Sequence, residues 1–274
     1  EGRFRIVHAG VFYYNEAYNR SQAGLRRRVR DLLSYRLDEV DRSPQSAGLL
    51  LRAVRQVVDE RPEVERRLEI DLVGNLSDSD RRLIHDLGLE DTVHAPGQVP
   101  AYEAARYIRG ADVLYLPFWY SRSGRPIPRI PSKTYEYMAA CKPIIVVGDD
   151  GDMRHMIRRA GTGKFPAAPT ADAVAERVVA LFTEHMNGGI RIHPDRDFIG
   201  RFHWERIAAQ FAGVIDTVVN RKESSAPASP LRNPVKESTR GEPDAASSRG
   251  GVSAAEPQYS MISETKSVRV DRDA

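Results

Sequence analysis

Short apolar runs alternate with longer amphipathic segments along most of this 274-residue chain. The runs have the length of strands and lie at residues 4–9, 68–73, 92–94, 113–116 and 143–147. Helical periodicity and helix-capping residues mark other segments, at residues 47–58, 80–87, 102–108, 153–159, 171–182 and 204–219. Strands separated by helices need right-handed crossover connections, so the pattern predicts an α/β domain with a doubly wound parallel sheet. The ligand of such a domain binds at the carboxyl ends of the strands.

The composition fits one domain followed by a tail. With 41% hydrophobic and 29% charged residues, the chain can form a sizeable core. We expect residues 1–222 to form the domain, with an inserted segment at about residues 11–45 that contains a basic helix. The basic side chains of that helix are interpreted as a solvated face rather than a site for nucleic acid. Residues 223–274 are rich in Ser, Pro and Gly, so we expect a disordered tail.

Charge, cysteine content and hydropathy restrict the possible partners and the compartment. The net charge of +3 permits phosphate ligands or an anionic membrane surface. The lone Cys141 excludes an intramolecular disulfide and a zinc site built from several cysteines. No apolar run approaches the length of a membrane-spanning helix. We expect a cytoplasmic protein, with peripheral binding to the cytoplasmic membrane face left open.

Residues 131–147 have the pattern of a loop, a helix and a buried strand, and they indicate an anion site. Ser132 is a good N-cap residue, which puts Lys133 at the first helical position. The helix dipole disfavours a cation there by roughly 0.3–1 kcal/mol, so a bound anion is expected nearby. Glu136 lies one residue beyond the capping-box position and is therefore available to a ligand hydroxyl. The alternatives are a lysine whose head reaches water and an ordinary exposed glutamate.

Several ordered segments resemble the nucleotide-sugar site of GT-B glycosyltransferases, especially family 4. The signature Pro-Ser-Lys-x-x-Glu-Tyr lies at residues 131–137, and residues 72–74, 87–99 and 111–117 match further family segments. The resemblance implies a Rossmann-like, C-terminal, donor-binding half. Its acceptor-binding, N-terminal half would lie in the same full-length chain or in a partner. Two positions depart from the family pattern: Cys141 replaces a glycine, and Pro128 replaces the first of two glutamates, the one that touches the donor sugar.

The resemblance also implies roles for individual residues. Lys133 and Arg42 would contact the diphosphate, and Glu136 would accept a hydrogen bond from the ribose. Together these three form the predicted catalytic set. The predicted donor-binding residues are Gly10, Arg42, Gly97, Val99, Arg129, Ser132, Lys133 and Glu136. Gly10 could equally be needed only for a tight turn, and Arg42 could pair with Asp41 or Glu39 on the surface.

The predicted function is transfer of a sugar from a nucleoside-diphosphate donor to an unknown acceptor, which could be a glycan, a lipid or a small molecule. The resemblance implies retention of configuration. We expect neither a metal ion nor a cofactor, and no nucleic acid partner. Asp149, Asp150 and Asp152 suggest a metal loop, but they precede a helix, so capping by Asp150 or Asp152 is favoured. The alternative functions are a GT-B sugar epimerase and a non-catalytic half that binds nucleotide sugar or has a structural role.

Overall fold

The computed structural model describes residues 2–12, 40–121 and 124–224. The chain divides into two units, Glu1–Ser224 and Ser225–Ala274, and the description below concerns the first. Most of the predicted insertion at residues 11–45, with its basic helix, lies outside the described residues. So does nearly all of the predicted tail at residues 223–274.

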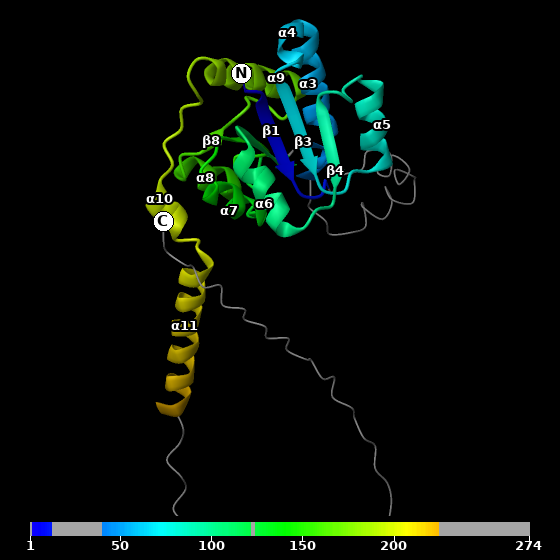
Figure 1. The fold of residues 1–274 in the computed structure, drawn as a ribbon. Coiled ribbons are helices and arrows are strands. Elements are labelled where there is room, and N and C mark those ends of the chain that lie inside the picture. The colour runs from blue at the N-terminus through cyan, green and yellow to red at the C-terminus, as the bar shows by residue number, and fades with distance from the viewer. Residues whose placement is uncertain (1, 13–39, 122–123, 225–274) are drawn as a thin grey trace, which may run out of the picture. The chain divides into compact units, whose positions relative to one another are not determined.

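A six-stranded parallel sheet forms the centre of the domain. Its order is β4 (Val93–Gly97), β3 (Leu68–Val73), β1 (Phe4–Ala9), β5 (Val113–Pro117), β7 (Ile144–Val147) and β8 (Gly163–Lys164), as Figure 1 shows in part. From β1 the chain builds outward through β3 and β4, and then returns to place β5 on the other side of β1. The strand order therefore reverses between β1 and β5, and this switch point is where open α/β sheets bind ligands.

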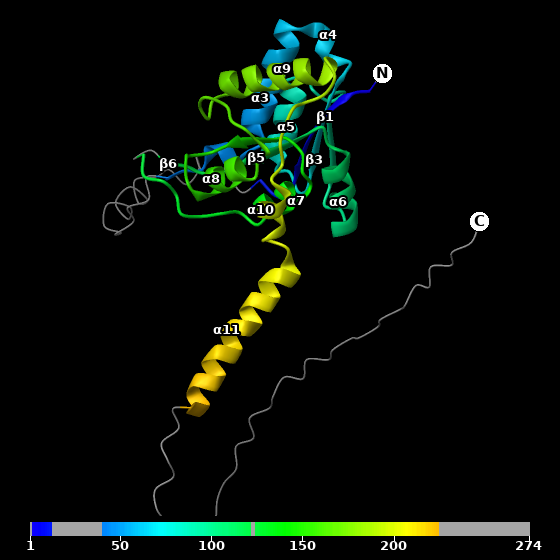
Figure 2. The ribbon, with the colours of Figure 1, turned by 90° about the vertical axis from the view of Figure 1, so that its left-hand side faces the viewer.

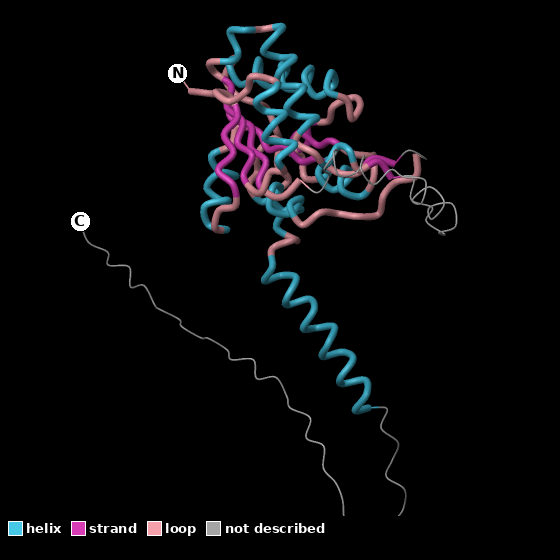
Figure 3. The backbone as a smooth tube through the Cα atoms, turned by 90° about the vertical axis from the view of Figure 1, so that its right-hand side faces the viewer, coloured by secondary structure: helices cyan, strands magenta, loops and turns pink. Residues whose placement is uncertain are grey.

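Helices cover both faces of the sheet, because successive side chains of each strand point to opposite faces. Ile6 and Tyr115 belong to one apolar cluster, and their neighbours Val7 and Leu116 belong to another. The first cluster includes side chains of α3 (Gly48–Glu60), α4 (Pro62–Glu65), α5 (Asp78–Asp86) and α9 (Ala171–Met186). The second includes side chains of α6 (Ala101–Gly110), α7 (Lys133–Ala139) and α8 (Asp152–Arg159). Figures 2 and 3 show helices on both sides of the strands, which confirms the predicted doubly wound α/β class.

Most element ends lie within a few residues of their predicted positions. The strand predicted at residues 92–94 is Val93–Gly97, and the helix predicted at 171–182 extends to Met186. Thr170 caps that helix by accepting a hydrogen bond from the Ala173 amide at 3.3 Å. Short elements were not predicted from the sequence: α4, β8, α10 (Arg196–Gly200), the 3₁₀ turn η1 (Ser43–Gln45) and the strands β2 (Val40–Asp41) and β6 (Tyr120–Ser121).

The small antiparallel pair of β2 and β6 is important for the site. Asp41 pairs with Tyr120, so the chain just after β2 lies beside the chain that leaves β5. The turn η1 then begins at Ser43, whose amide donates to the Asp41 carboxylate at 2.9 Å. This pairing brings Arg42 and Gln45 to the carboxyl end of β5.

The last described helix, α11 (Trp204–Ser224), confirms the helix predicted at residues 204–219. Its side chains from Trp204 to Val219 are exposed, including Trp204 at 71% and Phe211 at 66%. Within the described residues, none of the helices combines the length and apolar character needed to cross a membrane.

Candidate functional site

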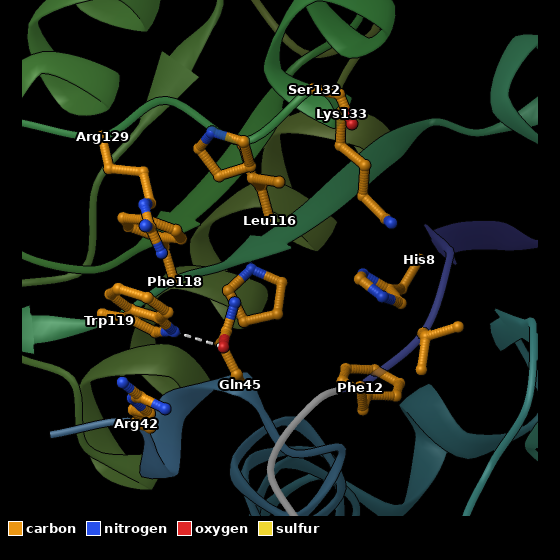
Figure 4. Close-up of a pocket in the computed structure, with 13 residues that line it drawn as sticks. His8, Phe12, Arg42, Gln45, Leu116, Phe118, Trp119, Arg129, Ser132 and Lys133 are labelled. Atoms are coloured by element: carbon orange, nitrogen blue, oxygen red, sulfur yellow. Dashed lines mark hydrogen bonds between the residues drawn. The ribbon is translucent and has the colours of Figure 1, made fainter.

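A cavity of about 510 Å³ lies at the carboxyl ends of β1 and β5, at the switch point of the sheet (Figure 4). One wall consists of residues at and after the end of β1: His8, Val11 and Phe12. A second wall is formed by residues 116–119, which end β5 and continue beyond it. Arg42, Gln45, Arg129 and residues 131–133 complete the lining. The cavity therefore joins three parts of the chain that are far apart in sequence.

The start of α7 differs from the prediction in one respect. Lys133 is the first helical residue, as predicted, but Ser132 does not cap the helix with its side chain. The reason is the backbone of Ser132, which already has helical dihedral angles (φ −56°, ψ −35°) instead of the extended conformation of a capping residue. The Ser132 side chain is exposed and lines the cavity.

Lys133 extends from the start of α7 across the end of β1. A Cβ atom added to Gly10 would collide with the Lys133 ammonium, which therefore lies directly against Gly10. Gly10 also has a φ of +141°, which favours glycine for conformational reasons. Burial lowers the pKa of Lys133, and the nearby Glu136 carboxylate opposes this shift. The ammonium is thus partly removed from water, which is unfavourable for a cation that has no bound anion.

Tyr137 of the same helix fixes the end of β1. Its buried hydroxyl oxygen accepts a hydrogen bond from the Ala9 amide at 2.8 Å. Burial raises the pKa of this tyrosine, so the hydroxyl stays protonated. The α7 helix that carries Lys133 is therefore tied directly to the strand end that carries Gly10.

Two arginines that line the cavity stack on the ring of Trp119. The guanidinium carbons of Arg42 and Arg129 lie 4.6 Å and 4.5 Å from the centre of the Trp119 ring. The indole N–H of Trp119 donates to the Gln45 side-chain oxygen, which fixes the ring (Figure 4). Such cation–π contacts hold a guanidinium in place without neutralising its charge. Arg42 and Arg129 therefore add two positive charges to the cavity that Lys133 lines.

The structure brings together only part of the predicted site. Arg42, Arg129, Ser132 and Lys133 line one cavity, and Gly10 lies under Lys133. Glu136 is exposed on α7 and does not line the cavity, although it is near enough to Lys133 to affect its pKa.

Gly97 and Val99 also lie outside the cavity, at and after the end of β4. The strand ends are nevertheless close to one another. The Gly74 amide donates to the Gly97 carbonyl at 2.8 Å, and a Cβ atom on Gly74 would collide with the Gly10 carbonyl. The ends of β1, β3 and β4 thus form one continuous surface of backbone beside Lys133.

The predicted capping of α8 by Asp150 or Asp152, in the acidic loop before that helix, was wrong. The N-cap of α8 is Gly151, which has no side chain, so neither Asp150 nor Asp152 caps this helix. Asp152 lies in the first turn, where a carboxylate interacts favourably with the helix dipole. Asp150 pairs instead with Arg158 at 3.0 Å, and Asp149 accepts a hydrogen bond from the Ile127 amide at 2.7 Å. Across the part of the chain that the structure describes, three or more His, Cys, Asp or Glu side chains are nowhere grouped to hold a metal ion.

Three residues that line the cavity, His8, Gln45 and Trp119, are not among the donor-binding residues predicted from the sequence. His8 had one available signal, since it is a polar residue that follows the apolar Ile6 and Val7 near the end of β1. The position of Trp119 just after the strand at residues 113–116 indicated that it lines the pocket, but its contact with Gln45 depends on the unpredicted pairing of β2 with β6.

The fold is a doubly wound α/β sheet whose switch point has a cavity lined by three cationic side chains, Lys133, Arg42 and Arg129. The family model described as glycosyl transferases group 1 matches residues 40–184, which is more than half of the chain. The protein belongs to this family, which confirms the resemblance found in its sequence.

Individual relatives were also found. The chain is 26% identical over 189 residues to MMP alpha-(1->4)-mannosyltransferase of Mycolicibacterium hassiacum, a match that covers 64% of this chain and 42% of the relative. Among solved structures, sucrose-phosphate synthase of Thermosynechococcus elongatus gives a TM-score of 0.49 at 20% identity, covering 79% of this chain and 59% of that one. Anabaena HepE in complex with UDP gives 0.48 at 15% identity, covering 79% and 49%. The chain spans less than half the length of the mannosyltransferase that it matches.

Proposed function

We propose that this chain is the donor-binding half of a glycosyltransferase that takes a sugar from a nucleoside diphosphate. The observation that carries the proposal is the convergence of Lys133, Arg42 and Arg129 on one cavity at the switch point of the sheet. Three cations beside the carboxyl ends of the strands suit a diphosphate, which carries several negative charges. The family to which the chain belongs supports the same class of reaction.

In this proposal the charge cluster promotes departure of the diphosphate. As the bond between the sugar and the diphosphate breaks, negative charge grows on the leaving oxygen, and preorganised cations lower the energy of that state. Lys133 stabilises one part of the diphosphate from α7, while Arg42 and Arg129 stabilise it from the opposite wall. Glu136 accepts a hydrogen bond from a ribose hydroxyl, and the backbone near Gly97 and Val99 borders the base. A second, acceptor-binding half supplies the acceptor, and the reaction retains configuration, as in the family 4 enzymes that the sequence resembles.

The three side-chain cations take the role that a divalent metal has in other transferases. We therefore propose that donor binding needs no metal ion. Titration of the donor in EDTA and in Mg²⁺ tests this point, and equal affinity is expected. A strict need for Mg²⁺ or Mn²⁺ would contradict it and would point to the carboxylates of Asp149, Asp150 and Asp152.

A thermal-shift screen with UDP-, GDP-, ADP- and dTDP-sugars tests the proposed function. A ligand that binds only the folded state raises the melting temperature by mass action. At a ligand concentration 100 times its Kd, the free energy of unfolding increases by about 2.7 kcal/mol. We expect one base to stabilise the chain more than the others, and the matching nucleoside to have a much weaker effect. No stabilisation by any nucleotide sugar would contradict the proposal. Turnover of the donor without an acceptor would indicate an epimerase.

A further inference from the structure

His8 lines the same cavity but has no role in the account above. It lies near the carboxyl end of β1, and only 3% of its surface is exposed. Its Nδ1 atom is 3.0 Å from the backbone carbonyl oxygen of Tyr115 on β5. A carbonyl oxygen only accepts hydrogen bonds, so Nδ1 must carry the proton of the neutral ring. The other nitrogen, Nε2, is then left with a lone pair and acts as an acceptor.

The acceptor Nε2 has no hydrogen-bond partner among the described residues, although it is buried. Buried polar atoms are nearly always paired, and an unpaired one costs about 1–3 kcal/mol. The ring stacks on Phe12 with centroids 4.1 Å apart, and Figure 4 shows it directed toward the cavity. A group within the cavity is therefore the natural partner of Nε2.

The electrostatic surroundings indicate which kind of group this is. Burial and the nearby Lys133 ammonium lower the pKa of His8 to about 4, so the ring is neutral at physiological pH. A carboxylate at this position would pair with Lys133 and repel a diphosphate. A neutral imidazole accepts a hydrogen bond without adding negative charge, and it therefore suits a hydroxyl group adjacent to phosphate.

The arrangement of the site separates the two ends of a nucleotide sugar. The residues proposed for the nucleoside, Glu136, Gly97 and Val99, all lie outside the cavity. Lys133 lies between them and His8, because its stem begins on α7 next to Glu136 and its ammonium crosses Gly10 at the end of β1. With the nucleoside outside the cavity and the diphosphate held by Lys133, Arg42 and Arg129, the part of the donor left to contact His8 is the sugar.

We propose that Nε2 of His8 accepts a hydrogen bond from a hydroxyl of the donor sugar, which makes His8 a specificity-determining residue of the donor site. The inference rests on the proposed function. It places the donor sugar beside His8, in the cavity that also receives the diphosphate.

Calorimetric titration of the chain with UDP-glucose, GDP-mannose, ADP-glucose and dTDP-glucose, each compared with its nucleoside diphosphate, tests the assignment. In His8→Asn the amide nitrogen takes the place of Nδ1 and still donates to the Tyr115 carbonyl, but nothing replaces Nε2. We expect this variant to bind the preferred nucleotide sugar about tenfold more weakly and the matching nucleotide equally well. His8→Gln places a polar amide near the position of Nε2, so it should recover most of the lost affinity.

Outcomes of this titration separate the two proposals. Equal weakening of nucleotide sugar and nucleotide in His8→Asn, or unchanged affinity for both, would overturn the role of His8. A loss in His8→Gln as large as that in His8→Asn would do the same. If the wild-type chain binds none of the four nucleotide sugars, the proposed function itself fails. Melting temperatures of the three proteins show whether each variant remains folded.

Discussion

The buried His8 should make the stability of the fold depend on pH. Its pKa is lowered from 6.5 to about 4 by burial and by the Lys133 ammonium, while the carbonyl of Tyr115 only partly offsets this. Below pH 6.5 the unfolded chain binds a proton that the folded chain binds only near pH 4, so stability decreases as the pH falls. The shift of about 2.5 pKa units, at 1.36 kcal/mol each, corresponds to about 2 kcal/mol lost at pH 5 and about 3 kcal/mol at pH 4.

Urea unfolding of the wild type and of His8→Asn at pH 7.5, 6, 5 and 4 measures this effect. Burial raises the pKa of the Asp149 carboxyl, so this group also titrates in the acid range. Such carboxylates titrate in both proteins, and their contributions cancel in the difference in stability between the two. The stability of the wild type relative to the variant should be constant above pH 7 and fall by about 3 kcal/mol by pH 4. Parallel pH profiles for the two proteins would refute the reasoning, because His8 would then be as accessible to protons when folded as when unfolded.

Three further predictions concern α7. Lys133→Ala should leave the unliganded chain equally stable or slightly more stable, but weaken the binding of a nucleoside diphosphate by about 1.5–3 kcal/mol. The affinity for the nucleoside alone should change little. Equal losses of affinity for both ligands in calorimetry would contradict the assignment of Lys133 to the phosphates. Glu136→Gln should weaken nucleotide binding by about 1–3 kcal/mol without lowering the melting temperature, and unchanged affinity would remove Glu136 from the site. Tyr137→Phe leaves the buried Ala9 amide unpaired and should lower the free energy of unfolding, measured in urea, by about 1–3 kcal/mol. Tyr135→Phe is the matched control and should lower it little. Similar losses for the two variants would argue against the hydrogen bond as the cause.

The sheet could be predicted from the sequence because its longer strands are rich in apolar residues and are separated by segments with helical periodicity. Ile144–Val147 and Val113–Pro117, for example, are buried at every position. The elements that escaped prediction are short. The two-residue strands β2 and β6 carry too few side chains for any periodicity, and they form only because distant segments meet.

The candidate site was predictable where local rules set it. Lys133 begins α7, as the pattern of residues 131–137 indicates, and Gly10 follows β1 where the backbone turns sharply. The Ser132 cap could not be judged from residue type alone, because capping depends on a backbone conformation that Ser132 does not adopt. The placement of Arg42 beside Trp119, and the unpaired Nε2 of His8, depend on tertiary contacts that no local pattern encodes.

A crystal structure of the chain with a bound nucleoside diphosphate would show whether the three cations at the switch point hold the phosphates. We expect the phosphates to lie at the carboxyl ends of β1 and β5, in hydrogen-bonding contact with the Lys133 ammonium and with the guanidinium of Arg42 or Arg129, without a bridging metal ion. Phosphates bound away from these side chains, or held by a metal ion on the acidic loop before α8, would contradict it.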